Sequence, residues 1–248
     1  MRVVAERLLV CVVLLGIWQA LPMVGLADPF FVSSPLAVLD RIGDWIASGE
    51  LLQNIWVTAR EALIGLIAGS VLGAAFGLFC GLNDAASRAL LPLMTVGNAL
   101  PRLAFAPLLI AWFGFGISSK IVLAASVVFF FIFFGVYSGI RSGSGLLVAN
   151  ARILGGRGFA LLWHVHLPQA YSWILAGLRL AVGYAFAAAV IGEYLGSDSG
   201  LGYLIVYGKE MLDMTQVFAG LAVVMTIVGC MDVGLRRVGN LAAARSTL

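Results

Sequence analysis

Residues 65-GLIAGSVLGAAFGLFCG-81 contain no charged side chain, and glycine recurs in them at every fourth position. The predicted span around them extends from Val57 to Leu82, which exceeds the roughly 20 residues that a helix needs to cross a bilayer. Residues four apart share one helix face, so the glycines form a smooth ridge. These glycines are Gly65, Gly69, Gly73, Gly77 and Gly81. The stretch predicts a membrane-spanning helix whose ridge packs closely against another helix; sliding along the ridge during gating is an additional hypothesis.

The composition extends this interpretation to the whole chain. Of its 248 residues, 62% are hydrophobic and 11% are charged, whereas soluble domains carry about 25% charged residues. A membrane β-barrel would show alternating segments of about 10 residues, and the sequence has none. The net charge of +3 is too small to suggest a nucleic-acid partner. We predict an all-α polytopic membrane protein that forms a single domain over residues 1–248.

Six apolar segments predict six transmembrane helices. Their approximate limits are Leu8–Leu26, Val57–Leu82, Leu90–Phe113, Ile121–Ile140, Ala170–Gly192 and Thr215–Leu235. The first has an alternative interpretation as a signal peptide, because Arg2 and Arg7 precede it and Gly25-Leu26-Ala27 resembles a cleavage site. We favour a retained span, since five more follow.

The distribution of arginine and lysine predicts the orientation, because cytoplasmic loops of membrane proteins are enriched in these residues. If the N-terminus is cytoplasmic, the positive residues on the inner side are Arg2, Arg7, Arg88, Arg141, Arg152, Arg157, Arg236, Arg237 and Arg245. Those on the outer side are only Arg41, Lys120 and Lys209. We therefore expect both termini in the cytoplasm.

Three loops are long enough to fold. The outer loop 27–56 contains Pro35 and then an amphipathic pattern through Ile46, which predicts a short interfacial helix. The outer loop 193–214 contains several glycines, and we expect a short helix after them. The loop 141–169 is the only long one predicted on the cytoplasmic side.

The stretch 145-GLLVANARILGGRGFALLWHVHLPQAY-171 lies mostly in this cytoplasmic loop. Its pattern predicts helix from Leu146 to Leu154, a break at Gly155-Gly156, and helix again over Phe159–His166. Pro168 then begins a new helix, where its missing N–H costs nothing. This basic and aromatic helix–bend–helix is typical of a docking element for a cytoplasmic partner; an amphipathic loop held by anionic membrane lipid is the alternative.

Nucleotide and metal chemistry are not predicted for this chain. Its two lysines, Lys120 and Lys209, both lack the spacing of a P-loop, G-x-x-x-x-G-K-[ST]. We therefore expect no enzyme activity and no cofactor here, and any ATP with its magnesium ion must be bound by a partner. His164 and His166 are two apart, which places them on different helix faces, and no third ligand is near.

Few ionisable residues occur within the predicted spans. Arg102 and Arg179 are the deepest, and either one could face a transport pathway and attract an anion; a structural pairing with neighbouring helices is the alternative. Arg60, Glu61 and Asp232 fall near the ends of spans, where a charged head can reach the interface.

The cytoplasmic stretch resembles the permease subunits of binding-protein-dependent ABC importers, whose signature is E-A-A, three residues, G, and later an apolar-x-L-P ending. Here it appears as Ala149-Asn150-Ala151, Arg152-Ile153-Leu154 and Gly155, and then as Val165-His166-Leu167-Pro168. The second alanine, the glycine and the Leu-Pro are kept. The glutamate is replaced by Ala149 and the first alanine by Asn150, which puts a partner contact made by that glutamate in doubt.

Other segments are similar to the nitrate, sulfonate and taurine subfamily of these permeases. They are 28-DPFFVSSPLAVLDRI-42, 100-LPRLAFAPLLIAWFGFGISSKI-121, 176-AGLRLAVGYA-185 and 193-EYLGSDSGLGYLI-205. The resemblance covers nearly the whole chain after the first span.

The resemblance implies the fold of a type I importer permease with six spans. It also implies a second permease copy, two cytoplasmic ABC ATPase subunits and a soluble substrate-binding protein that docks on the outer loops. The residues that would couple to the ATPase are Ala149, Asn150, Ala151, Arg152, Gly155, Gly156, Arg157, Leu167 and Pro168. The solute would be a small organic or inorganic anion, such as a sulfonate or nitrate.

Other function classes fit the residues less well. A secondary transporter would need acidic or histidine side chains deep in its spans, and this chain has almost none. A membrane enzyme would need paired carboxylates, a Ser-His-Asp set or a metal cluster, and none is visible. A membrane scaffold without an ATPase partner remains an alternative.

Overall fold

The computed structural model describes residues 2–142 and 145–245, and all regular secondary structure in these ranges is helical. The first seven helices are α1 (Arg2–Met23), α2 (Pro29–Val32), α3 (Pro35–Ser48), α4 (Glu50–Leu82), α5 (Asp84–Ala99), η1 (Arg102–Phe105) and α6 (Ala106–Phe113). The others are α7 (Ile117–Arg141), α8 (Gly145–Ile153), α9 (Gly158–Leu161), η2 (Leu162–His166), α10 (Leu167–Leu195), α11 (Leu201–Glu210) and α12 (Met214–Arg245).

Some predictions concern positions that are not described. Both ends of the predicted domain 1–248 and positions 143–144 of loop 141–169 lie outside the described residues. The same holds for the side chains of Arg2, Arg7, Arg236, Arg237 and Arg245, which entered the count of positive charges.

Within the part of the chain that the structure describes, four helices are long and apolar enough to cross a membrane. They correspond to the second, fourth, fifth and sixth predicted spans. They are Glu50–Leu82, Ile117–Arg141, Trp173–Leu195 and Met214–Gly234. The first predicted span is α1, of which Leu9–Met23 is a shorter apolar helix. The protein is therefore an all-helical polytopic membrane protein, as its composition predicts.

The third predicted span, Leu90–Phe113, is not one continuous helix. It covers most of α5 together with η1 and α6, and the segments Asp84–Ala99 and Arg102–Phe113 are inclined to each other by 79°. Leu100 and Pro101 leave the helix between them, because proline disfavours helical backbone in the residue before it and has no N–H to donate. A second proline, Pro107, lies in the first turn of α6, where it is well tolerated.

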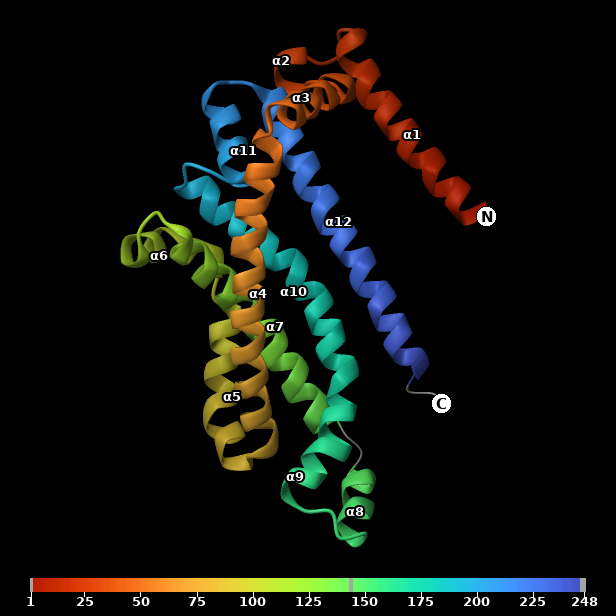
Figure 1. The fold of residues 1–248 in the computed structure, drawn as a ribbon, viewed down its shortest axis with the longest axis vertical. Helices are drawn as coiled ribbons and strands as arrows, with labels where there is room; N and C mark the ends of the chain where they lie inside the picture. Colours follow the sequence, from red (N-terminus) through yellow and green to blue (C-terminus); the bar gives the residue numbers. More distant parts are fainter. Residues whose placement is uncertain (1, 143–144, 246–248) are drawn as a thin grey trace.

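The core consists of α4, α7 and α10, which pack side by side (Figure 1). The glycine ridge of α4 faces α7. A Cβ atom on Gly69 would lie 2.5 Å from the carbonyl oxygen of Ala125, and one on Gly73 would lie 2.5 Å from that of Phe129. Backbone therefore touches backbone along this contact, and a larger residue at either position would force the helices apart.

Two helical ends extend beyond this core. At one end lie α2, α3 and α11, beside the start of α4 and α12; at the opposite end α8 and α9 project alone (Figure 1). The short helices predicted in loops 27–56 and 193–214 are present as α3 and α11. Arg41 of α3 forms a salt bridge of 2.7 Å with Asp213, just before α12. We call these the α3–α11 end and the α8–α9 end.

Candidate functional site

The α8–α9 segment, residues 145–168, turns sharply after α8, and its backbone explains the spacing of two predicted coupling residues. Gly155 has a φ of 87°, a left-handed conformation that glycine adopts without steric cost. Its N–H donates to the carbonyl of Arg152 at 3.0 Å, and the N–H of Gly156 donates to that of Ala151 at 2.8 Å. These two bonds form a Schellman motif. An alanine and a glycine four residues apart are thus parts of one helix terminus.

Apolar and basic side chains are exposed together on this segment. Ile153 and Leu154 are 82% and 88% exposed, and Trp163 is 59% exposed. Of the other predicted coupling residues, Ala149, Asn150, Arg152, Gly155, Arg157 and Pro168 are exposed, and Ala151, Gly156 and Leu167 are half-buried. Exposed groups of large apolar side chains are typical of surfaces that bind another protein. The segment therefore has the character of a docking element.

The segment is joined to α10 without a break. Its last part, η2, is a turn of π-helix, and the N–H of Leu167 donates to the carbonyl of Leu162. Pro168 lies in the first turn of α10. Burial of His166, and to a smaller extent the charge of Arg152, lower the pKa of the imidazole. Because helix continues from η2 into α10, a displacement of the segment would be transmitted directly to a membrane span.

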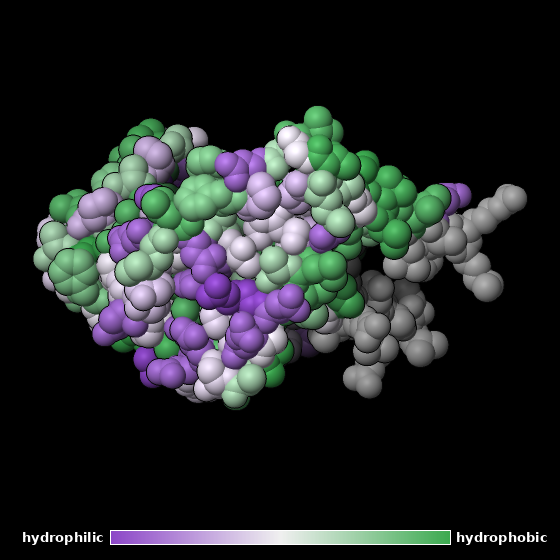
Figure 2. Space-filling model, turned by 90° about the horizontal axis from the view of Figure 1, so that it is seen from above, coloured by the Kyte–Doolittle hydropathy of each residue, from purple (hydrophilic) through white to green (hydrophobic). Residues whose placement is uncertain are grey.

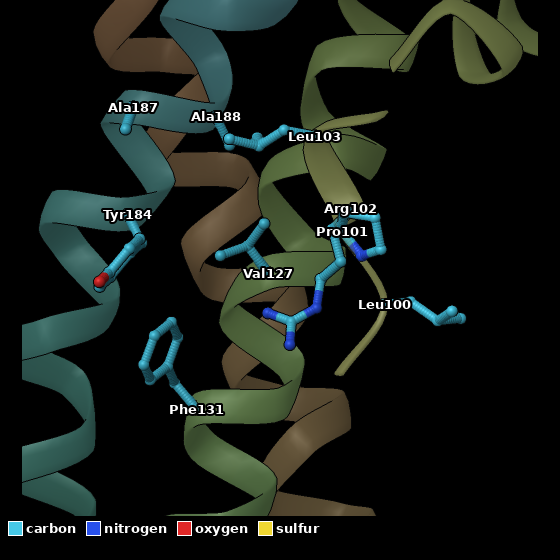
Figure 3. Close-up of a pocket in the computed structure, with 9 residues that line it drawn as sticks. All are labelled: Leu100, Pro101, Arg102, Leu103, Val127, Phe131, Tyr184, Ala187 and Ala188. Carbon is cyan, nitrogen blue, oxygen red and sulfur yellow. The ribbon is translucent and has the colours of Figure 1, made fainter. Parts of the chain in front are cut away.

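Arg102 lines a cavity of about 310 Å³ between η1, α7 and α10 (Figure 3). Phe131 and Tyr184 both line it, and their rings stack on each other with centroids 4.7 Å apart. The guanidinium lies over the ring of Phe130, 4.6 Å from its centroid, and donates to the carbonyl of Asn98 at 2.6 Å and to the side-chain oxygen of Asn98. Arg102 therefore closes the end of α5 and also places a cation in an otherwise apolar wall.

Arg179 is a residue of α10 and lies outside the Arg102 cavity. It lines a second cavity, of about 600 Å³, together with Asp232 of α12. Its Nε is buried and has no hydrogen-bond partner among the described residues. Tyr184 borders both cavities. The two candidate pathway arginines thus lie on the same side of α10, but in different cavities, and the structure does not bring them into contact.

Three buried ionisable residues form a cluster that the sequence interpretation missed. Glu61 of α4 is 3% exposed, Lys120 of α7 is 1% exposed and Glu193 of α10 is 0% exposed. The prediction that Glu61 reaches an interface is therefore wrong, because α7 and α10 cover it. The placement of Lys120 in an outer loop is also wrong, because Lys120 lies within α7 and is buried against α10. We call these three residues the carboxyl cluster.

The carboxyl cluster lies beneath the start of α11, whose backbone donors are bound by side chains of other helices. The N–H of Gly200 donates to Asn54 at 2.7 Å, that of Leu201 to Thr58 at 2.8 Å, and that of Gly202 to Glu193 Oε2 at 2.7 Å. The first turn of a helix leaves its N–H groups without partners, and here α4 and α10 supply them. The glycine-rich stretch before α11 is thereby fixed to the membrane core.

Comparison with known proteins identifies this architecture. Residues 62–239 match the family described as binding-protein-dependent transport system inner membrane component. The putative aliphatic sulfonates transport permease protein SsuC of Bacillus subtilis is 32% identical over 90% of this chain and 81% of that protein. The taurine transport system permease protein TauC of Escherichia coli is 29% identical over 90% of this chain and 83% of that protein. The inward-facing MetNI methionine ABC transporter shares the fold, with a TM-score of 0.69 at 16% identity, over 77% of this chain and 95% of that one.

Proposed function

This chain belongs to the family of binding-protein-dependent transport system inner membrane components and is a permease component of an ABC importer; from this premise we propose how it works with its partners. Two copies form the pathway for a small solute in the inner membrane. Two ABC ATPase subunits bind below them, and a soluble binding protein delivers the solute from outside. ATP and its magnesium ion are bound by the ATPase subunits. Both termini face the cytoplasm.

The observation that carries this proposal is the continuity of the α8–α9 segment with α10. The exposed side chains of Ile153 and Leu154 and the charges of Arg152 and Arg157 would seat in a groove of the ATPase. Movement of the ATPase would then reach α10 through η2. Ala149 and Asn150 replace the glutamate and the first alanine of the family signature. This chain has no carboxylate at that position, so the exposed apolar side chains of Ile153 and Leu154 supply more of the contact with the ATPase.

The second copy would pack against the exposed side of α10. Leu180 and Tyr184 are 58% and 52% exposed there, and both of the cavities that contain a candidate arginine open beside Tyr184. A homodimer would place two such faces around one central pathway. If this face of α10 contacted only lipid, the guanidinium groups of Arg102 and Arg179 would lie beside hydrocarbon, which is energetically costly.

The α3–α11 end would receive the binding protein. Hydrophilic residues gather on this end of the molecule (Figure 2). Its exposed charged residues are mostly acidic: Asp28, Asp40, Asp44, Glu50, Asp198 and Glu210, with Lys209. A binding protein with a basic rim would be complementary to this surface.

The solute would be a small anion such as a sulfonate or nitrate. Arg102 is the better candidate for an anion contact, because it is the cation of an apolar cavity lined by Phe131 and Tyr184. The relatives named for aliphatic sulfonates and taurine agree with this chemistry. Mass spectrometry of ligands retained by the cognate binding protein would identify the solute, and a cationic ligand would contradict an anion pathway.

Reconstitution of the full importer in nanodiscs tests the coupling. We expect Arg152→Glu and Gly155→Pro to abolish the stimulation of ATP hydrolysis by the binding protein while membrane insertion is unchanged. Arg88→Glu is the control, because Arg88 is an exposed arginine on α5, outside the α8–α9 segment. If both variants co-purify with the ATPase and retain stimulated hydrolysis, the docking assignment is wrong.

A further inference from the structure

The carboxyl cluster has no role in the transport cycle proposed above, and its burial requires an explanation of its own. Glu61, Lys120 and Glu193 are each at least 97% buried. Ionisable side chains inside a membrane protein are costly and are retained for a reason. The three groups come from α4, α7 and α10 and meet beneath α11. They line neither the Arg102 cavity nor the Arg179 cavity, and they lie outside the α8–α9 segment.

The two carboxyl groups of this cluster are close neighbours. The side chains of Glu61 and Glu193 lie within hydrogen-bonding reach of each other. Glu61 Oε2 and Glu193 Oε1 are both buried without a donor among the described residues. The hydroxyl of Thr58 also interacts with Glu193, but it already donates to the carbonyl of Asn54. Two carboxylates in one buried site cannot both be ionised, because their repulsion is not screened by water. A single proton between them supplies the donor that both oxygens lack.

Lys120 determines how many protons balance the charge. Its Nζ donates to the carbonyl of Gly196 at 2.7 Å and to that of Phe115, and it interacts electrostatically with Glu61 and Glu193. One lysine cation and one carboxylate cancel, so the cluster is neutral only if the other carboxyl carries a proton. Two more charged groups act on it, Arg60 of α4 and Asp198 before α11. Both are exposed, and water screens their influence.

The contacts indicate which carboxyl is protonated. Glu193 accepts the N–H of Gly202 at the N-terminus of α11, where backbone donors and the helix dipole favour a negative charge. Glu61 receives no backbone N–H among the described contacts. The carboxylate is therefore Glu193, and the proton is on Glu61.

We propose that Glu61 and Glu193 form a buried proton-binding site which, together with Lys120, latches the outer stretch Gly196–Gly202 onto the membrane core. Lys120 holds the carbonyl of Gly196 at one end of this stretch, and Glu193 holds the N–H of Gly202 at the other. The proton joins α4 to α10 directly below them. Loss of the proton would place two negative charges side by side and would release the stretch.

Charge-balanced variants of the purified importer in nanodiscs test the site. Glu61→Gln removes the bound proton but keeps the cluster neutral, so we expect an unchanged midpoint of thermal unfolding. Glu61→Gln with Glu193→Gln leaves Lys120 without a countercharge, and we expect the midpoint to fall by roughly 10 °C. Adding Lys120→Met to this pair restores neutrality, and we expect it to recover at least part of the loss. A Glu61→Gln variant as unstable as the double variant would overturn the proposal.

Infrared spectroscopy tests the proton itself, and its decisive measurement is made on the wild-type protein. The wild-type protein should show the C=O stretching band of a protonated, buried carboxyl group, identified by its shift on ¹³C labelling of glutamate. The band should be absent from Glu61→Gln and present in Glu210→Gln, a control at an exposed glutamate. Absence of the band from the wild-type protein at neutral pH would refute the site.

The latch has its own readout. In a cysteine-free background, a thiol introduced by Ser199→Cys lies within the latched stretch. We expect a thiol reagent to modify it faster in the unbalanced double variant than in the wild type or in Glu61→Gln. Equal rates in all three backgrounds would show that the charge balance of the carboxyl cluster does not hold this stretch.

Discussion

Glycine-rich turns occur at both ends of the molecule, and they are held in opposite ways. After α8, Gly155 and Gly156 complete a helix terminus with bonds to their own helix, and the surface around them is exposed. Before α11, Gly200 and Gly202 bind side chains of α4 and α10, and both are buried. The first turn is local and leaves its side chains free for a partner. The second depends on tertiary structure, because side chains of α4 and α10 bind its backbone N–H groups.

The largest test of this contrast is Glu193→Ala. The substitution leaves the buried N–H of Gly202 without its acceptor and opens a cavity where the side chain was, while Glu61 can still ionise to balance Lys120. We therefore expect a loss of about 3 kcal/mol in the free energy of unfolding. Glu210→Ala removes an exposed carboxylate at the other end of α11 and should change stability by less than about 0.5 kcal/mol. Thermal unfolding in matched detergent measures both. Equal effects would show that the start of α11 is held by its own helix alone.

A pair of alanine substitutions compares the two turns directly. Gly155 and Gly200 both have positive φ, 87° and 103°, so a side chain is strained at either position. A Cβ on Gly155 would meet open space, whereas one on Gly200 would collide with the carboxyl group of Glu193. We expect Gly155→Ala to cost about 1 kcal/mol and Gly200→Ala to cost clearly more.

The two substitutions should differ in what they impair: Gly155→Ala should impair ATPase coupling, and Gly200→Ala should impair stability. Gly155→Ala disturbs the Schellman turn and should weaken ATPase coupling in an importer that still unfolds near the wild-type temperature. Gly200→Ala should lower the unfolding temperature, with coupling reduced only as far as folded protein is lost. If Gly200→Ala is as stable as Gly155→Ala, the close approach of Glu193 is not a constraint.

The sequence predicts the parts of the fold that depend on local pattern. Long apolar runs predict the spans, the glycine period predicts a close helix contact, and the pattern after Pro35 predicts α3. The break at Gly155-Gly156 follows from backbone preferences alone. The prediction that Pro168 begins a new helix is wrong in part, because helix continues from η2 into α10 and Pro168 only lies in the first turn of α10. The bend between α5 and α6 was missed, although Pro101 and Pro107 were its signal. Apolar composition does not distinguish one straight span from two short helices.

The carboxyl cluster was missed because its members lie far apart in sequence and each falls at the end of a predicted span. A signal exists in α4 itself. Asn54, Thr58 and Glu61 follow the i, i+4, i+7 spacing of one helix face, and Gly65 continues that face into the ridge. The face is thus polar at one end and glycine-lined along the rest. The partners on α7 and α10 are set by packing, which no local pattern contains.

The cluster also changes an argument about function class. The sequence disfavours a secondary transporter because few acidic residues lie deep in the predicted spans. Glu61 and Glu193 are two acidic residues that are buried within α4 and α10, toward the α3–α11 end of these helices. The family assignment rests on other residues and is unaffected. What the cluster adds is a titratable element at the end of the permease remote from the α8–α9 segment.

The smallest expected effect concerns the pKa of His166, which lies in the α8–α9 segment. Burial first, and the Arg152 charge second, lower its pKa below the usual 6.5. The folded state therefore binds a proton less readily than the unfolded chain. The stability that this group contributes is complete above pH 6.5 and is lost as the pH falls from 6.5 through the folded pKa.

NMR titration of histidine ring protons in the nanodisc-embedded importer measures this, with His166→Gln to assign the signal. We expect Arg152→Ala to raise the pKa of His166 while leaving it below 6.5, because burial remains the larger cause. Arg157→Ala is the matched control, since Arg157 is an exposed arginine of the same segment but not a cause of the shift. An equal response to both substitutions would mean that His166 senses the general charge of the segment. A shift confined to Arg152→Ala would show that Arg152 interacts electrostatically with His166, the residue that directly precedes α10.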